Sequence, residues 1–202
     1  SLNKLKSAQI GNMGADLVQV YEIGTRFMID SGWIVPMQQM IDADSYDVSE
    51  IEPNLAAYYT IDNELYSMPF NSSTPIMYYN KDMFDAAGLD YPSATEAMTW
   101  DEFVTLAKTL TLDANGNNAL SPDFDKENIK QYGCVVDNWT WQLEVWALSN
   151  GGRWFTEDGS ACTINDPKVI ESIQKVADLT LVENCMPCLL YTSPSPRDRS
   201  LS

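Results

Sequence analysis

The sequence of 202 residues predicts an α/β fold. Short runs rich in Val, Ile and Tyr alternate with segments whose apolar residues recur at helical spacing, and this alternation is typical of α/β proteins. Hydrophobic residues make up 45% of the chain and charged residues 20%, as in ordinary globular proteins. The sequence contains no apolar run of the roughly eighteen residues that a membrane span needs.

The first part of the chain is predicted to contain short elements. Apolar spacing over residues 2–10 indicates the end of an amphipathic helix, which the following glycines break. The run "ADLVQVY", residues 15–21, indicates a strand, and residues 22–25 are expected to form a turn. Thr25 is then expected to cap a short helix that ends near a glycine. Residues 33–59 are expected to form loops and short helices.

Later segments carry clearer signals. A turn and a strand are predicted over 62–70, a second strand over 76–80, and a short helix over 81–88 that ends at Gly88. Thr99 and Glu102 form a capping box before a helix with apolar residues at helical spacing. A second strong helix is predicted to begin at Asp166 and Pro167, with one apolar face formed by Val169, Ile173, Val176 and Ala177.

The segment 112–125, "LDANGNNALSPDFD", has the polar composition of a calcium loop. Its Gly116 falls at the fourth position, whereas an EF-hand needs glycine at the sixth. A hairpin or a loop between helices is therefore expected there.

Charge and composition exclude several functions. The net charge is −17, and acidic residues outnumber basic ones in both 1–72 and 73–188, which disfavours nucleic acids and anionic membranes as partners. The chain has no histidine, so triads, Cys-His dyads and His-ligated metals are excluded. Cys185 and Cys188 have the spacing of a redox or zinc half-site, but a second pair is missing. A structural disulfide or buried thiols are expected instead, with no metal and no cofactor.

Three features could bind a ligand. Glu22 follows a predicted strand, where ligands gather in open α/β folds, although a solvated turn carboxylate is the simpler interpretation. Ser72 and Ser73 lie in a run of hydroxyl residues between two apolar runs, and could offer donors and acceptors or simply form a tight turn. Trp139 and Trp141 are candidates for stacking on a sugar or polyol, whereas Trp146 is expected in the core.

Four segments, "LVQVYEIGT", "PFNSSTPIMYYNKDMFDAAGLD", "TWDEFVTLAKTL" and "WTWQLEVWALSNGG", occur in this order. Together they resemble the extracellular solute-binding proteins of ABC importers, and most of all the branch that binds sn-glycerol-3-phosphate. The resemblance implies a fold of two lobes, incomplete at both ends here, that closes on its ligand. It places 1–72 in one lobe and 73–188 in the other. Residues 189–202, rich in Ser and Pro and without periodicity, are expected to be a non-native tail.

The resemblance also implies a function. Glu22, Ser72 and Ser73 would bind ligand hydroxyls, and Trp139 or Trp141 would stack on the ligand. The ligand would be glycerol-3-phosphate, a glycerophosphodiester or an oligosaccharide, delivered by a monomeric protein to a membrane permease. The protein would be periplasmic or extracellular, either free or lipid-anchored, and would not be an enzyme. Without its other parts, the chain is expected to bind ligand poorly.

Two other classes are compatible with the residues alone. A glycoside hydrolase could pair two carboxylates, Glu22 and Glu144, beside a tryptophan platform. A structural or adhesive surface protein would bind no small molecule saturably.

Overall fold

The structure is a computed structural model that describes residues 2–11, 13–19, 22–137 and 139–188. The described chain forms two compact units, of which the first ends at Thr74 and the second begins at Pro75. The proposed non-native tail, 189–202, lies outside the described residues. Within the described ranges, the structure has no helix that is both long enough and apolar enough to cross a membrane.

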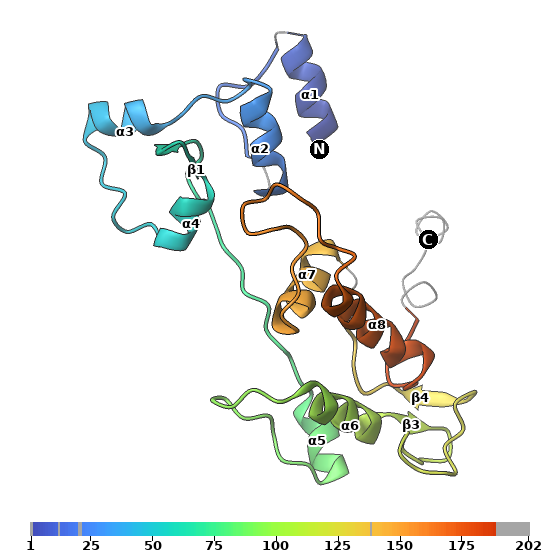
Figure 1. The fold of residues 1–202 in the computed structure, drawn as a ribbon. Helices are drawn as coiled ribbons and strands as arrows, with labels where there is room; N and C mark the ends of the chain where they lie inside the picture. Colours follow the sequence, from blue (N-terminus) through green and yellow to red (C-terminus); the bar gives the residue numbers. More distant parts are fainter. Residues whose placement is uncertain (1, 12, 20–21, 138, 189–202) are drawn as a thin grey trace, which may run out of the picture. The chain divides into compact units, whose positions relative to one another are not determined.

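The first unit contains short helices and one hairpin (Figure 1). Asp62 and Asn63 have φ angles of 53° and 63°, the left-handed conformation that a two-residue hairpin turn needs. The buried apolar side chains in the described part of the first unit are Met28, Ile41 and Leu65. In chain order the elements are α1 (Leu2–Ile10), α2 (Glu22–Asp30), α3 (Gln38–Asp44), α4 (Pro53–Tyr58), β1 (Thr60–Ile61) and β2 (Glu64–Leu65).

The structure corrects the predicted turn at 22–25. Helix α2 begins at Glu22 and continues through these residues. Thr25 is therefore inside the helix, where it is buried, and is not the cap. Gly24, Thr25 and Met28 are all buried and lie on one face of the helix. Gly24 is therefore part of the buried helix face and does not mark a turn.

Two predicted strands are absent from the described residues. Residues 15–19 are irregular, while the end of that predicted strand, 20–21, lies outside the described part. Residues 66–80 also have no regular structure, which removes the strand at 76–80 and shortens the strand at 62–70 to β2. A strand requires a partner for its main-chain groups, and only β1 pairs with β2 in this unit's described part.

The second unit contains the predicted helices. Gly88 ends the first with a φ of 66°, and Thr99 and Glu102 form the expected capping box. The Asp166 side chain accepts a hydrogen bond from the Lys168 N–H and caps the last helix. In chain order the elements are α5 (Lys81–Ala87), α6 (Trp100–Leu110), β3 (Leu112–Asp113), β4 (Ile129–Gln131), α7 (Thr140–Ser149) and α8 (Pro167–Leu181).

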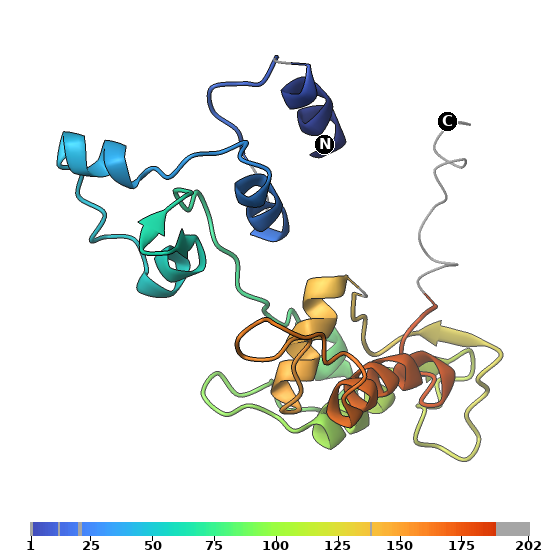
Figure 2. The ribbon, with the colours of Figure 1, turned by 45° about the horizontal axis from the view of Figure 1, so that its top comes forward.

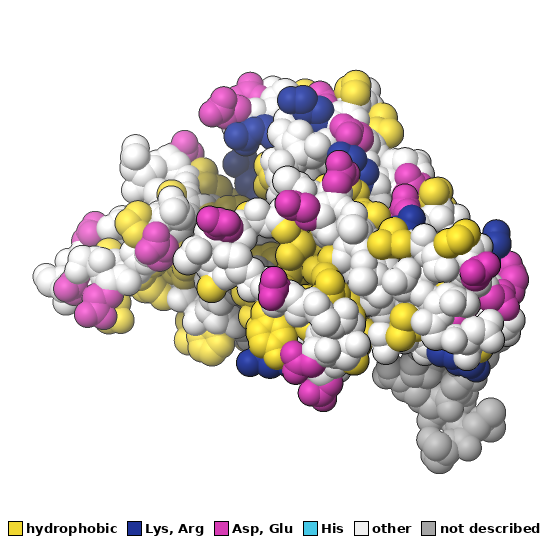
Figure 3. All heavy atoms as spheres, turned by 90° about the horizontal axis from the view of Figure 1, so that it is seen from below, with side chains coloured by type: hydrophobic (Ala, Val, Ile, Leu, Met, Phe, Trp, Pro, Cys, Tyr) yellow, Lys and Arg dark blue, Asp and Glu magenta, His cyan; other side chains and the backbone are white. Residues whose placement is uncertain are grey.

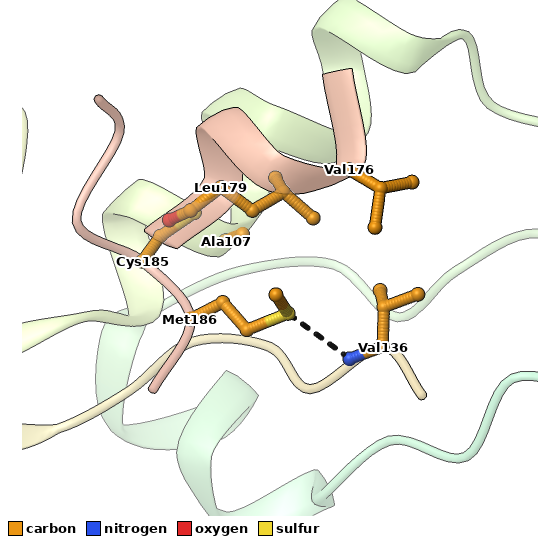
Figure 4. Packing of buried hydrophobic residues seen from close by; sticks show 6 residues of the cluster. All are labelled: Ala107, Val136, Val176, Leu179, Cys185 and Met186. Carbon is orange, nitrogen blue, oxygen red and sulfur yellow. Dashed lines mark hydrogen bonds between the residues drawn. The ribbon is translucent and has the colours of Figure 1, made fainter. Parts of the chain in front are cut away.

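Helices α7 and α8 lie side by side, as the two ribbon views show (Figures 1 and 2). The core of the unit lies where α6 and α8 meet the segments that follow β4 and α8 (Figure 4). The segment after β4 can come this close to α6 only with glycine at position 133, because a Cβ there would lie 1.8 Å from the Ala107 carbonyl oxygen. The buried cluster consists of Ala107, Val136, Val176, Leu179, Cys185 and Met186.

The segment 112–125 belongs to a hairpin, as expected, because it begins with β3 and the chain returns after it in β4, which pairs with β3 in antiparallel fashion. The buried carboxylate of Asp113 accepts hydrogen bonds from the main-chain N–H groups of Asn115 (2.8 Å), Asn117 (2.9 Å) and Asp125 (2.9 Å). These donors, led by the Asp125 N–H, lower the pKa of Asp113 to about 2. The carboxylate therefore holds the loop closed.

Acidic side chains are spread over the face shown in Figure 3 rather than gathered in one place. This distribution agrees with the acidity of both parts of the sequence.

Candidate functional site

Glu22 is the first residue of α2 and belongs to the first unit. At the start of a helix the main-chain N–H groups have no partner within the helix. Glu22 thus lies at a helix N-terminus rather than in the predicted turn.

Ser72 and Ser73 lie in the irregular segment 66–80, immediately before the residue at which the first unit ends. Every residue from 70 to 80 is exposed, including apolar Phe70 (83%) and Tyr78 (87%). The apolar residues on either side of the serines are therefore not core in the described chain. The hydroxyl groups are accessible to solvent on a segment that connects two compact units.

Trp139 and Trp141 lie at the start of α7 in the second unit, with Trp139 at the N-cap position. Their side chains are 65% and 50% exposed. The Trp139 carbonyl accepts hydrogen bonds from the N–H groups of Gln142 and Leu143 at 3.0 and 3.1 Å, which fixes its main chain at the helix end. Two flat aromatic rings are thus presented to solvent from one helical turn.

Trp146 anchors the same helix. Its ring packs edge-to-face against Trp100 of α6, with centroids 5.4 Å apart, and contacts the core cluster. Leu143 also packs against the cluster, and Ala147 is completely buried. This confirms the prediction that Trp146 belongs to the core. Leu143, Trp146 and Ala147 lie on the face of α7 that packs against the core. Trp139 and Trp141, in the first turn, lie outside this face and are accessible to solvent.

Gln142 is a polar residue of this turn that the sequence interpretation did not select. Its Oε1 atom is buried and, among the described residues, has no hydrogen-bond partner. A buried acceptor is costly unless a donor reaches it. The only sequence signal was its position between two tryptophans, which does not distinguish it from a surface glutamine.

The candidate residues fall into two groups. Glu22, Ser72 and Ser73 belong to the first unit, and Trp139 and Trp141 belong to the second. Their roles therefore remain predictions.

Glu144, the second carboxylate of the hydrolase alternative, is half-buried on α7. Within the described ranges, no group of three or more His, Cys, Asp or Glu side chains is arranged to hold a metal ion. The Cys185 sulfur lies beside the Cys134 sulfur, at 3.9 Å.

Residues 2–184 match the family model described as bacterial extracellular solute-binding protein. The sn-glycerol-3-phosphate-binding periplasmic protein UgpB of Yersinia pseudotuberculosis is 35% identical over 168 residues, which are 81% of this chain and 36% of that protein. The chain thus spans about a third of the length of this curated relative.

Two solved structures show the fold. The ABC substrate-binding protein Lmo0181 of Listeria monocytogenes, in complex with cycloalternan, has a TM-score of 0.74 and 23% identity, covering 99% of this chain and 48% of that one. A solute-binding protein of Thermotoga lettingae bound with α-D-tagatose has a TM-score of 0.68 and 24% identity, covering 93% of this chain and 45% of that one. These are two-lobed solute-binding proteins, which confirms the predicted fold class.

Proposed function

Because the chain belongs to the bacterial extracellular solute-binding proteins, we propose that it forms part of the substrate-binding component of an ABC importer. The proposed ligand is a small polyol phosphate or sugar, with glycerol-3-phosphate, a glycerophosphodiester and an oligosaccharide as the candidates. The family match over residues 2–184 carries this proposal. The similarity to a glycerol-3-phosphate-binding protein supports the choice of ligand.

The proposed mechanism is closure of two lobes around the ligand, one containing residues 1–72 and the other 73–188. Binding favours the closed form because the ligand contacts both lobes only in that form. The permease then recognises the closed form. The irregular segment 66–80, which is exposed from residue 70 onward, supports a hinge role, since a connection without helix or strand can absorb changes in φ and ψ.

The proposed contacts follow from the chemistry of the candidate residues. The Glu22 carboxylate accepts hydrogen bonds from ligand hydroxyls, and the Ser72 and Ser73 hydroxyls donate and accept. Trp139 or Trp141 stacks on an apolar face of the ligand, which the exposure of both rings supports.

The proposed site of action is the periplasm or the cell exterior, where the protein, as a monomer, meets its permease. The family description and the periplasmic relative support this location. The family consists of binding proteins, which disfavours the glycoside hydrolase alternative.

The test is a ligand titration of the protein encoded by the complete reading frame, obtained by sequencing the parent DNA on both sides of this chain. Glycerol-3-phosphate, a glycerophosphodiester and an oligosaccharide are each titrated while tryptophan fluorescence is recorded. We expect saturable binding of one of them. Replacing the stacking tryptophan, in Trp139→Ala or Trp141→Ala, should weaken binding about tenfold or more, since burying a large side chain is worth about 1.5–3 kcal/mol.

Phe155→Ala is the matched control, because Phe155 is another exposed aromatic residue of the second unit. It should leave the affinity unchanged. Absence of saturable binding to all three ligands would contradict the proposal. Turnover of a chromogenic glycoside, abolished in Glu22→Gln, would instead establish the hydrolase.

A further inference from the structure

Two cysteines that are far apart in sequence meet in the core of the second unit. Cys134 follows β4, and Cys185 follows α8. The Cys134 N–H donates a hydrogen bond to the Cys185 carbonyl oxygen at 3.1 Å. The Cys134 sulfur lies 3.5 Å from the same oxygen and 3.9 Å from the Cys185 sulfur. Main chain and side chains of the two residues are thus both in contact.

This geometry suits a disulfide. The two sulfur atoms are 3.9 Å apart, and the main-chain hydrogen bond from Cys134 to Cys185 holds the two residues together. The S–S bond of a disulfide is about 2.05 Å long. Rotation of the two side chains toward each other can supply the remaining approach. We propose that Cys134 and Cys185 form a structural disulfide when the protein resides outside the cytoplasm.

The surroundings of the cysteines favour a bond between Cys134 and Cys185 over one between Cys185 and Cys188. Cys185 is completely buried and lies beside Ala107 and Leu179, as Figure 4 shows. The Cys134 thiol points to the Cys185 sulfur, and the Cys185 thiol donates to the Leu179 carbonyl at 3.5 Å. The main chain on the other side is held as well, because the Gly133 N–H donates to Thr111 Oγ1 at 2.9 Å. Both partners therefore have fixed positions before any bond forms.

The redox step balances with an organic disulfide as oxidant, either glutathione disulfide or the active-site disulfide of a thiol–disulfide oxidoreductase. The half-buried Cys134 sulfur, once deprotonated, attacks the oxidant and releases one of its thiols. The Cys185 sulfur then attacks Cys134 and releases the second thiol. Two protein thiols lose two protons and two electrons, and the oxidant becomes two thiols.

The surroundings of Cys134 also affect the rate at which the two thiols are oxidised. The hydrogen bond between the thiols, together with burial, raises the pKa of the Cys134 thiol. Since the thiolate is the nucleophile, oxidation of the folded chain by glutathione disulfide should be slow at pH 7 and faster at pH 9. Bond formation during folding, before burial, avoids this obstacle.

The new bond would close a loop that contains α7 and α8. A crosslink over so long a segment restricts the unfolded chain and stabilises the folded one. The inference is independent of the ligand, so its failure would leave the proposed function in place.

The test uses the whole 202-residue chain, refolded with glutathione disulfide or with dithiothreitol. Trypsin digestion without reduction is followed by mass spectrometry. We expect a crosslink between peptides 131–153 and 176–197, which contain Cys134 and Cys185 respectively. Cys188 is in the second peptide, so Cys188→Ser is digested in parallel and should keep the crosslink. The oxidised chain should melt roughly 10 °C above the reduced one.

Cys134→Ser and Cys185→Ala should each abolish the crosslink and the difference in melting temperature. The half-buried Cys134 provides a variant that can fold even if Cys185→Ala does not. Cys162→Ser is the matched control, because this exposed cysteine is in another peptide and should change neither result. A bond between Cys185 and Cys188, or complete alkylation of Cys134 after oxidation, would overturn the proposal.

Discussion

Asp113 shows how one buried carboxylate can organise a loop. Its pKa is lowered to about 2 because main-chain N–H groups, first that of Asp125, donate to it. An unfolded aspartate has a pKa of about 3.9. The folded value is the lower one, so the stabilisation is fully present above about pH 4 and is lost as pH falls toward 2.

We predict that Asp113→Asn lowers the urea midpoint of the second unit at pH 7, because an amide presents N–H groups to N–H donors. The difference from the original chain should shrink between about pH 4 and pH 2, where the aspartate becomes protonated. Tryptophan fluorescence reports this unit, since every tryptophan except Trp33 belongs to it. Asp123→Asn, a charge-matched change in the same loop, should have little effect. A constant difference across the pH range would refute the assignment.

At the scale of an element, α6 depends on its capping box. The Glu102 N–H donates to Thr99 Oγ1 at 3.3 Å, and the Thr99 N–H donates to the Glu102 carboxylate at 2.7 Å. The helix contributes Ala107 and Leu110 to the buried residues of the unit. Loss of the cap should therefore weaken the whole unit rather than one helix end.

We predict that Thr99→Ala lowers the free energy of unfolding by about 1 kcal/mol, the usual cost of removing an N-cap. Thr105→Ala is the control within the same helix. Its hydroxyl only donates back to the Asp101 carbonyl on the exposed side, and alanine is the better helix former. Urea unfolding should show a loss for the first variant and no loss for the second. Equal midpoints would mean that tertiary packing alone holds the helix start.

At the scale of the whole molecule, the connection between the units is irregular and largely exposed. Residues 66–80 lack helix and strand, and all of 70–80 is exposed. Exposed, irregular segments are the preferred sites of proteolysis. We predict that brief chymotrypsin treatment of the 202-residue chain cuts first after Phe70, Tyr78 or Tyr79, leaving the helices of the second unit uncut.

Mass spectrometry of the early fragments identifies the first cut. Phe84 is the internal control, because it is buried on α5 and should be protected although it is close in sequence. A first cut at Phe84 or within α6 would show that the second unit opens more easily than the connection.

The caps and the glycine at the end of α5 could be predicted from the sequence because their interactions are local. Thr99 forms hydrogen bonds with Glu102, three residues later in the chain. Gly88 ends α5 because glycine readily adopts the left-handed conformation found there. The order of the four family-like segments likewise identified the family, which the match over 2–184 confirms. For the candidate site, the sequence could name polar and aromatic residues, but their roles remain to be tested.

The strands predicted at 15–21 and 76–80 were wrong in the described residues because a strand is determined by its partner, which local propensity does not contain. The contact between Cys134 and Cys185 could not be predicted either, because the two residues are 51 positions apart in the sequence. The sequence by itself determined the caps of α6 and α8, the glycine end of α5, the family and the acidic charge of both parts of the chain. Only the tertiary structure decided which sulfurs meet and that the apolar residues beside Ser72 and Ser73 are exposed, because these depend on packing between distant segments.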